Sequence, residues 1–148
     1  MMRETTLRTF VSIVVLCACI GVRADTYTVD DDGPADFSSI QAAINFAGPG
    51  DVVYVERGVY NEAVVMKDRV NLYGAGPHIT TIDGGGTIDH LVTYAGWDGA
   101  VISGFRIANS TRSVAGSAGI DILEGPLIVR NNIIENHRNG IFVKSDLG

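Results

Sequence analysis

The stretch AVISGFRIAN at residues 100–109 decides the fold, because LIVRNNIIEN at 127–136 repeats its pattern at a constant offset of 27 residues. The corresponding pairs are Ala100 with Leu127, Ile102 with Val129, Phe105 with Asn132, Ile107 with Ile134, and Asn109 with Asn136. Self-similarity at a fixed period of about 20 to 50 residues indicates a solenoid, in which each unit packs only against its neighbours.

A second correspondence follows at a shorter offset of 21 residues, where Ile120 and Ile122 match Ile141 and Val143. The difference between the two offsets places all the variation in length in the turn at 110–118. Repeated strands joined by a turn of variable length are what stacked coils require. We therefore expect each strand to pair with its equivalent one coil away.

Short β-prone runs separated by Gly, Asn, Asp or Pro fill most of the chain. They are 27–29, 52–55, 63–66, 70–73, 80–82, 91–94, 100–107, 120–123, 127–134 and 141–143. Few of the gaps carry the tight two-residue turns of hairpins, so a meander is disfavoured. The sequence predicts one all-β domain built as a parallel solenoid.

One short helix is expected near the start. Ser38 and Gln41 have the S-x-x-Q spacing of a capping box, in which each side chain binds an amide at the helix start. An apolar stripe follows at Ile40, Ala43, Ile44 and Ala47. Gly48 and Pro49 then end the helix.

Several motifs together resemble the start of pectin-lyase-like right-handed parallel β-helix proteins. They are DFSSIQAAI at 36–44, GDVVYV at 50–55, GVYNE at 58–62, LYGAG at 72–76 and TIDG at 81–84. The N-terminal part of pectinesterases and many exported bacterial β-helix repeat proteins share them. The resemblance covers roughly residues 27–86, and implies a right-handed β-helix whose early helix caps one end.

Pectinesterases, as the resemblance implies, use two aspartates assisted by a glutamine and an arginine. The chain has no Gln after Gln41 and no strand like Asp-Phe-x-Phe-Gly, so we expect no complete catalytic set. Gly58, Tyr60 and Glu62 of the shared motif could mark a pectinesterase-like protein. We expect structural roles instead: Gly58 in a turn, Tyr60 packed on the coil, and Glu62 as an exposed or capping carboxylate.

Residues 1–24 are expected to be an export signal, with a basic start at Arg3 and Arg8, an apolar run at 10–20, and small residues before the cleavage point at Ala24. The apolar run is too short to span a bilayer. Cleavage after Ala24 is the main expectation; lipidation at Cys19 or a retained anchor are alternatives. The β-helix domain would then occupy 25–148 of an exported protein that is secreted, periplasmic or on the cell surface.

The expected mature chain is acidic. Residues 1–24 hold three of the eleven Lys and Arg and one of the seventeen Asp and Glu, which leaves eight basic against sixteen acidic residues and a net charge of −8. Such a surface repels phosphate backbones, so we expect no nucleic-acid partner. It also disfavours a polyanion such as pectate. Both cysteines, Cys17 and Cys19, lie in the signal, so no disulfide or thiolate site is expected.

The candidate carbohydrate-binding residues are Trp97 and Asp98, in the turn Gly96–Gly99. An exposed tryptophan ring can stack on a sugar face; the alternative is that it packs against a neighbouring turn. A glycosidase pair would come from Asp83, Asp89, Asp98 and Asp121, and a lyase base from Arg106 or Arg130. We expect turn-forming aspartates and exposed arginines instead.

No metal site or cofactor is expected. Asp30–Asp32 and Asp36 lack the alternating spacing of a calcium loop and are expected to form a turn before the helix. His78, His90 and His137 share no ligand spacing, and we interpret them as surface residues. Asn132 is expected to join an asparagine stack at a coil corner.

The last coil, ending near Val143, has no cap in the sequence. We expect either that the chain is truncated at its C-terminus or that a partner or second copy covers this end. Three functions stay open. The protein binds polysaccharide; or it is the N-terminal part of a pectinesterase-like, lyase or glycoside-hydrolase type of enzyme; or it is a structural or adhesive solenoid.

Overall fold

The computed structural model describes residues 23–144, which form a right-handed parallel β-helix with one short helix. The expected signal at residues 1–24, with Cys17 and Cys19, lies outside the described residues except for its last two. The elements in chain order are β1 (Thr26–Val29), α1 (Ile40–Phe46), β2 (Val52–Val55), β3 (Gly58–Tyr60), β4 (Val64–Met66), β5 (Asn71–Gly74), β6 (Thr80–Asp83), β7 (His90–Ala95), β8 (Ala100–Ser103), β9 (Arg106–Ala108), β10 (Ala118–Glu124), β11 (Leu127–Arg130), β12 (Ile133–Glu135) and β13 (Asn139–Val143).

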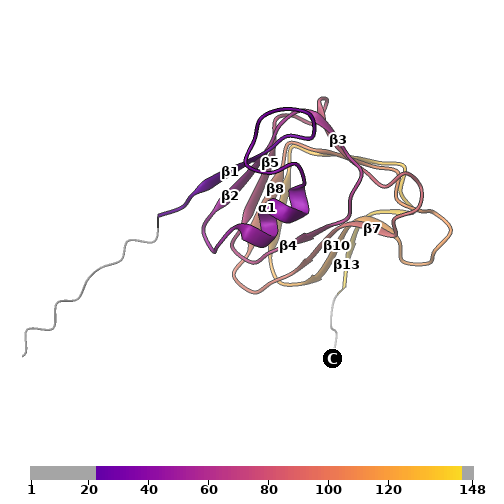
Figure 1. Ribbon diagram of the computed structural model, residues 1–148. Helices are drawn as coiled ribbons and strands as arrows, with labels where there is room; N and C mark the ends of the chain where they lie inside the picture. Colours follow the sequence, from indigo (N-terminus) through magenta and orange to yellow (C-terminus); the bar gives the residue numbers. More distant parts are fainter. Residues whose placement is uncertain (1–22, 145–148) are drawn as a thin grey trace, which may run out of the picture.

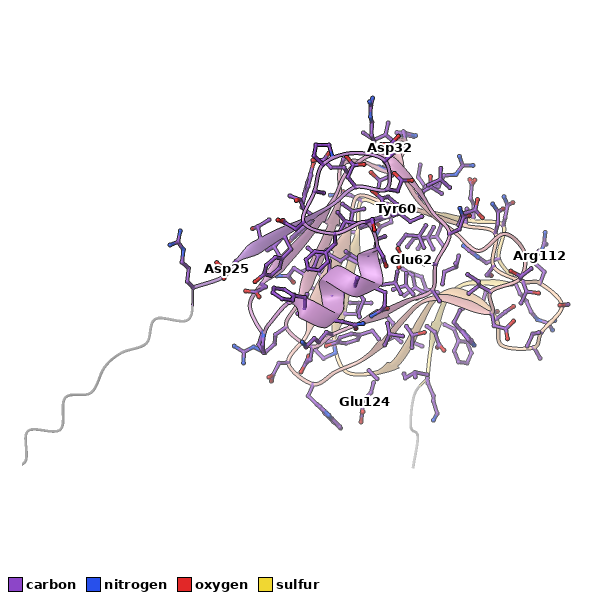
Figure 2. All side chains as sticks on the ribbon, viewed as in Figure 1. Asp25, Asp32, Tyr60, Glu62, Arg112 and Glu124 are labelled. Atoms are coloured by element: carbon purple, nitrogen blue, oxygen red, sulfur yellow. The ribbon has the colours of Figure 1, made fainter. Side chains whose placement is uncertain are left out.

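The strands form three parallel sheets that run along the solenoid. Sheet A has the order β1-β2-β5-β8-β11, sheet B β3-β6-β9-β12, and sheet C β4-β7-β10-β13. The register confirms both offsets in the sequence, since Ile102 pairs with Val129 and Ile120 with Ile141. The turn at 110–118 lies between sheets B and C. Figure 1 shows it extending from the body of the solenoid, and Figure 2 labels Arg112 there.

The core consists of side chains stacked in register through successive coils. One stack runs through Val53, Leu72 and Ile102; the others are Tyr60, Ile82 and Ile107, then Val64, Val92 and Ile120, then Met66, Tyr94 and Ile122. Every one of them is buried. Full burial of such a side chain contributes about 1.5 to 3 kcal/mol. Because residues 23–144 contain no cysteine, these stacks stabilise the described part of the chain without help from a disulfide.

Two long strands predicted from the sequence are wrong in their bounds, because each bends at a corner. The run 100–107 divides into β8 and β9 at Gly104, and 127–134 divides into β11 and β12 at Asn131. Gly104 has a φ of 86° and Asn131 a φ of 52°, so both corners use left-handed backbone. A Cβ on Gly104 would lie 2.4 Å from the Gly74 carbonyl oxygen, so only glycine fits there.

The helix α1 covers the N-terminal end of the solenoid, in front of the stacked coils in Figure 1. Its predicted apolar stripe is confirmed, because Ile40, Ala43, Ile44 and Ala47 are fully or almost fully buried. The predicted capping box is wrong. The N-cap is Ser39 instead of Ser38, and its side chain accepts from the Ala42 amide.

Gln41, the other half of the expected box, closes the free edge of sheet C. Its Oε1 accepts from the Val65 amide at 2.6 Å, and its Nε2 donates to the Val65 carbonyl at 3.3 Å. The side-chain amide therefore takes the place of a neighbouring strand for β4. No helix within residues 23–144 is long and apolar enough to cross a bilayer.

The last coil is less buried than the coil before it. Ile141 and Val143 are 45% and 61% exposed, whereas their register partners Ile120 and Ile122 are at 0% and 9%. Within residues 23–144, no further strand pairs with the outer edges of β11, β12 and β13.

Candidate functional site

The turn between β7 and β8 presents Trp97 to solvent. Its side chain is the most exposed large apolar group in the described chain, at 73%. No ring contact within residues 23–144 involves it. The indole face is therefore accessible to a ligand.

Asp68, from the turn of the preceding coil, holds the backbone of this turn. Its carboxylate accepts from the Asp98 and Gly99 amides, both at 3.1 Å, and from the Tyr94 hydroxyl at 2.8 Å. Burial raises the pKa of Asp68, but these hydrogen bonds and one from the Trp97 amide outweigh it, so the pKa is lowered overall. Burial, and then the bond to Asp68, raise the pKa of Tyr94 to about 12.

A shallow hollow of about 300 Å³ lies beside this turn. Its lining consists of Asn71, Asp98, Gly99, Ala100, Val101, Pro126 and Ile128. The Asn71 Oδ1 accepts from the Val101 amide at 3.0 Å. The Asn71 Nδ2 and the Asp98 carboxylate have no hydrogen-bond partner in the described part of the chain. The hollow thus offers one free donor and one free anionic acceptor against an apolar wall.

Two tyrosines on the outer face of sheet A were missed by the sequence reading. Tyr54 lies between Val53 and Val55, which are fully buried, so it points out of the solenoid. It pairs in register with Tyr73, the next residue after buried Leu72. The sequence contained this information, because side chains alternate between the two faces of a strand at 52–55 and Tyr54 lies between two valines of the core.

The motif of Gly58, Tyr60 and Glu62 supports the N-terminal end. Gly58 lies in β3, a strand that the sequence reading did not predict, in close contact with Asp31. Tyr60 is buried, and its hydroxyl shares its one proton between the carbonyls of Val29 and Glu56, at 3.3 and 3.2 Å. Burial first, and then the nearby carboxylate of Asp31, raise the pKa of Tyr60 to about 12.

Glu62 lies at the start of α1, as Figure 2 shows. Its carboxylate accepts from the Ser39 hydroxyl at 2.8 Å and from the amides of Ile40 and Gln41 at 2.8 and 3.0 Å. These are the bonds of a helix cap, because they satisfy amides that the helix leaves free.

The asparagine stack lies one turn later than expected. Asn109 donates to Asp83 at 3.1 Å and accepts from Asn136 at 3.1 Å, which makes a ladder across three coils. Asn132, which the sequence placed in such a stack, binds main chain instead: it accepts from the Phe105 amide and donates to the Ile102 carbonyl.

Buried Asp121 and half-buried His90 form a pair on sheet C. Asp121 is 5% exposed, and its Oδ2 lies 3.3 Å from the His90 Nδ1. The Asp121 Oδ1 and the His90 Nδ1 are buried and make no hydrogen bond with described residues. Asp121 thus has a histidine, not a second carboxylate, as its neighbour.

The interpretation of the histidines as surface residues holds only for His78, which is exposed. His90 and His137 are half-buried. The His137 Nε2 lies 2.8 Å from the Ile107 carbonyl, so this nitrogen carries the proton, and its Nδ1 accepts from the Ser110 amide at 3.2 Å. Both bonds join neighbouring coils.

The remaining charged candidates are not brought together in one common site. Arg106 pairs with Glu135 on sheet B, and Arg130 is exposed on sheet A. Asp30–Asp32 bring their ligand atoms within 4.8 Å of one another. Asp36 is engaged elsewhere, because its carboxylate accepts from the Thr28 amide and hydroxyl, which lowers its pKa.

Comparison with solved structures shows the same fold. Pectin methylesterase PemA from Erwinia chrysanthemi superposes with a TM-score of 0.63 at 17% sequence identity, covering 79% of this chain and 45% of that chain. A pectin methylesterase in complex with a hexasaccharide gives the same values. A mutant pectin methylesterase with another hexasaccharide gives a TM-score of 0.62 at 17% identity, over 78% of this chain and 44% of that chain. The chain therefore spans less than half the length of these enzymes.

No curated protein matches the chain in sequence. A family model described as "Protein of unknown function (DUF1565)" matches residues 24–147, which is nearly all of it. The chain belongs to the DUF1565 family, and its fold is the parallel β-helix of the pectin methylesterases.

Proposed function

We propose that this is an exported β-helix protein that binds polysaccharide through the turn bearing Trp97. The observation that carries the proposal is the exposed indole beside a hollow with a free amide and a free carboxylate. A flat apolar ring with hydrogen-bonding groups next to it suits a sugar, which has an apolar face and a rim of hydroxyl groups. The hexasaccharide complexes of the pectin methylesterases lend support at the level of the fold alone.

The test is Trp97→Ala, measured by affinity gel electrophoresis and calorimetry against a panel of soluble polysaccharides. We expect wild-type protein to be retarded by at least one glycan, and Trp97→Ala to weaken that binding at least tenfold. Val114→Ala is the matched control, because Val114 is also exposed but lies on the projecting loop. Equal retardation of Trp97→Ala and wild type would contradict the role of the turn.

A second candidate is that the chain is the N-terminal part of a carbohydrate-active enzyme. The shared fold with pectin methylesterases supports this candidate at the level of the fold alone. Ester release from methylated pectin by the native exported protein would support it. If no glycan is bound or cleaved, a structural or adhesive solenoid becomes the better proposal, with a partner or second copy covering the exposed last coil.

A further inference from the structure

The outer face of sheet A carries two parallel rows of side chains, each running across the strands. One row consists of Thr28, Tyr54, Tyr73, Ser103 and Arg130, and the other of Thr26, Val52, Asn71, Val101 and Ile128. Strand alternation points both rows outward, because Val53, Leu72 and Ile102 between them are fully buried. Within the first row, Ser103 is itself only 7% exposed. The hollow of the candidate site lies on the second row, at Asn71, Val101 and Ile128.

Tyr54 and Tyr73 lie side by side on β2 and β5, in the coils before the Trp97 turn. Both are half-buried, so part of each side chain reaches solvent. Neither takes part in a ring contact in the described chain. Neither tyrosine lines the hollow, but Tyr73 lies only two residues from Asn71 of its lining, on the same strand.

The spacing along this face favours a polymer. Adjacent strands of a sheet lie about 4.8 Å apart, so equivalent side chains repeat at that distance along the solenoid. This is close to the length that one pyranose unit takes in an extended chain. A polysaccharide lying across the strands would therefore advance by about one sugar per strand. It would pass Tyr54 on β2, then Tyr73 and Asn71 on β5, and then Asp98 in the turn before β8.

The charge of this face favours an uncharged polymer. The hollow has one carboxylate, from Asp98, and neither Lys nor Arg in its lining. Arg130 is the one cation in the two rows, and it lies on the last strand. The chain as a whole has a net charge of −6. A polyuronate would meet the Asp98 carboxylate at the hollow with no cation in the lining to offset the repulsion, whereas hydroxyl groups can donate to Asp98 and accept from Asn71.

We propose that the outer face of sheet A is a track for an extended neutral polysaccharide, with Tyr54 and Tyr73 as a stacking platform that continues the Trp97 site. The inference rests on the proposed function and extends it to a defined surface and ligand class. It separates this protein from its structural neighbours, which are described with pectin.

The experiment compares four proteins on mixed-linkage β-glucan, xylan, galactomannan and polygalacturonate by affinity gel electrophoresis. They are wild type, Trp97→Ala, the double variant Tyr54→Ala/Tyr73→Ala, and its control Tyr54→Phe/Tyr73→Phe, which keeps both rings. We expect wild type to bind a neutral glycan more tightly than polygalacturonate. The double alanine variant should lose at least tenfold in affinity, and the phenylalanine variant less than threefold. A thermal unfolding curve for each variant shows that its fold is kept.

The other outcomes are distinct. Unchanged affinity of the double alanine variant, with binding lost in Trp97→Ala, overturns the track and leaves the proposed function standing. Preference for polygalacturonate overturns the neutral ligand class. Absence of binding to any of the four glycans by wild type overturns both proposals together.

Discussion

At the scale of single residues, Asp68 and Tyr94 join the core to the candidate site. Tyr94 is fully buried in its stack, yet its hydroxyl reaches the carboxylate that holds the Trp97 turn. A change inside the solenoid can thereby alter the position of an exposed ring. Neither role is visible in the sequence, because Asp68 and the residues it binds are separated by about one coil.

The raised pKa of both buried tyrosines predicts a loss of stability in alkaline solution. An unfolded tyrosine ionises near pH 10, but Tyr60 and Tyr94 keep their protons up to about pH 12 when folded. Unfolding thus releases protons between these values, so the free energy of unfolding is unaffected below about pH 10 and falls as the pH rises towards 12. Tyr94→Phe should make this fall less steep, and Tyr60→Phe/Tyr94→Phe should flatten it further.

The measurement is urea unfolding at several pH values between 9 and 11.5. If the free energy of unfolding falls as steeply with pH in Tyr94→Phe as in wild type, Tyr94 does not titrate as proposed. The lowered pKa of Asp68 affects stability in acid instead. The stabilisation from Asp68 is present above about pH 4, and it is lost as the pH falls through the pKa that Asp68 has in the folded protein.

At the scale of elements, side chains bind backbone groups at three places where no neighbouring strand or helical turn does so. Gln41 completes the edge of β4, Asn132 binds the corner between β8 and β9, and Glu62 caps α1. The sequence could predict the helix, because its apolar stripe is a local pattern. It could not predict the true cap, because Glu62 lies more than twenty residues from the amides that it binds.

Glu62→Ala should therefore destabilise the protein by about 1 to 3 kcal/mol, because it leaves two amides at the helix start without an acceptor. Glu62→Gln should cost less, since an amide oxygen can replace part of the carboxylate. Glu135→Ala is the control: its pair with Arg106 is exposed on the solenoid surface and should be worth about 0 to 1 kcal/mol. Chemical unfolding monitored by circular dichroism measures all three, and equal losses for Glu62→Ala and Glu135→Ala would refute the capping role.

At the scale of the whole molecule, residues 23–144 form a solenoid that α1 covers at one end and whose last strands, β11 to β13, are the less buried. The repeat of 27 residues in the sequence predicted the stacking correctly, since equal offsets mean equal register. The bends at Gly104 and Asn131 were missed because apolar runs continue through them. The paired tyrosines on sheet A were missed because only the register of β2 and β5 brings them together.

This asymmetry predicts that stability is distributed unevenly along the solenoid. Ile107 and Ile134 are register partners in sheet B, the first fully buried and the second half-buried. Ile107→Ala should cost about 2 to 5 kcal/mol, and Ile134→Ala less than half as much. Hydrogen exchange should likewise be fastest in β11, β12 and β13. Equal losses for the two variants, or uniform exchange along the chain, would show that the last coil is as well covered as the others.

The turn between sheets B and C changes length from coil to coil while the strands on both sides keep their register. Residues 112–114 are exposed at the tip of its longer copy. Such a corner lets a lineage gain or lose residues by small insertions without shifting a single core side chain. New recognition loops can thus arise there independently of the scaffold, and the same position is the natural place to graft a foreign peptide.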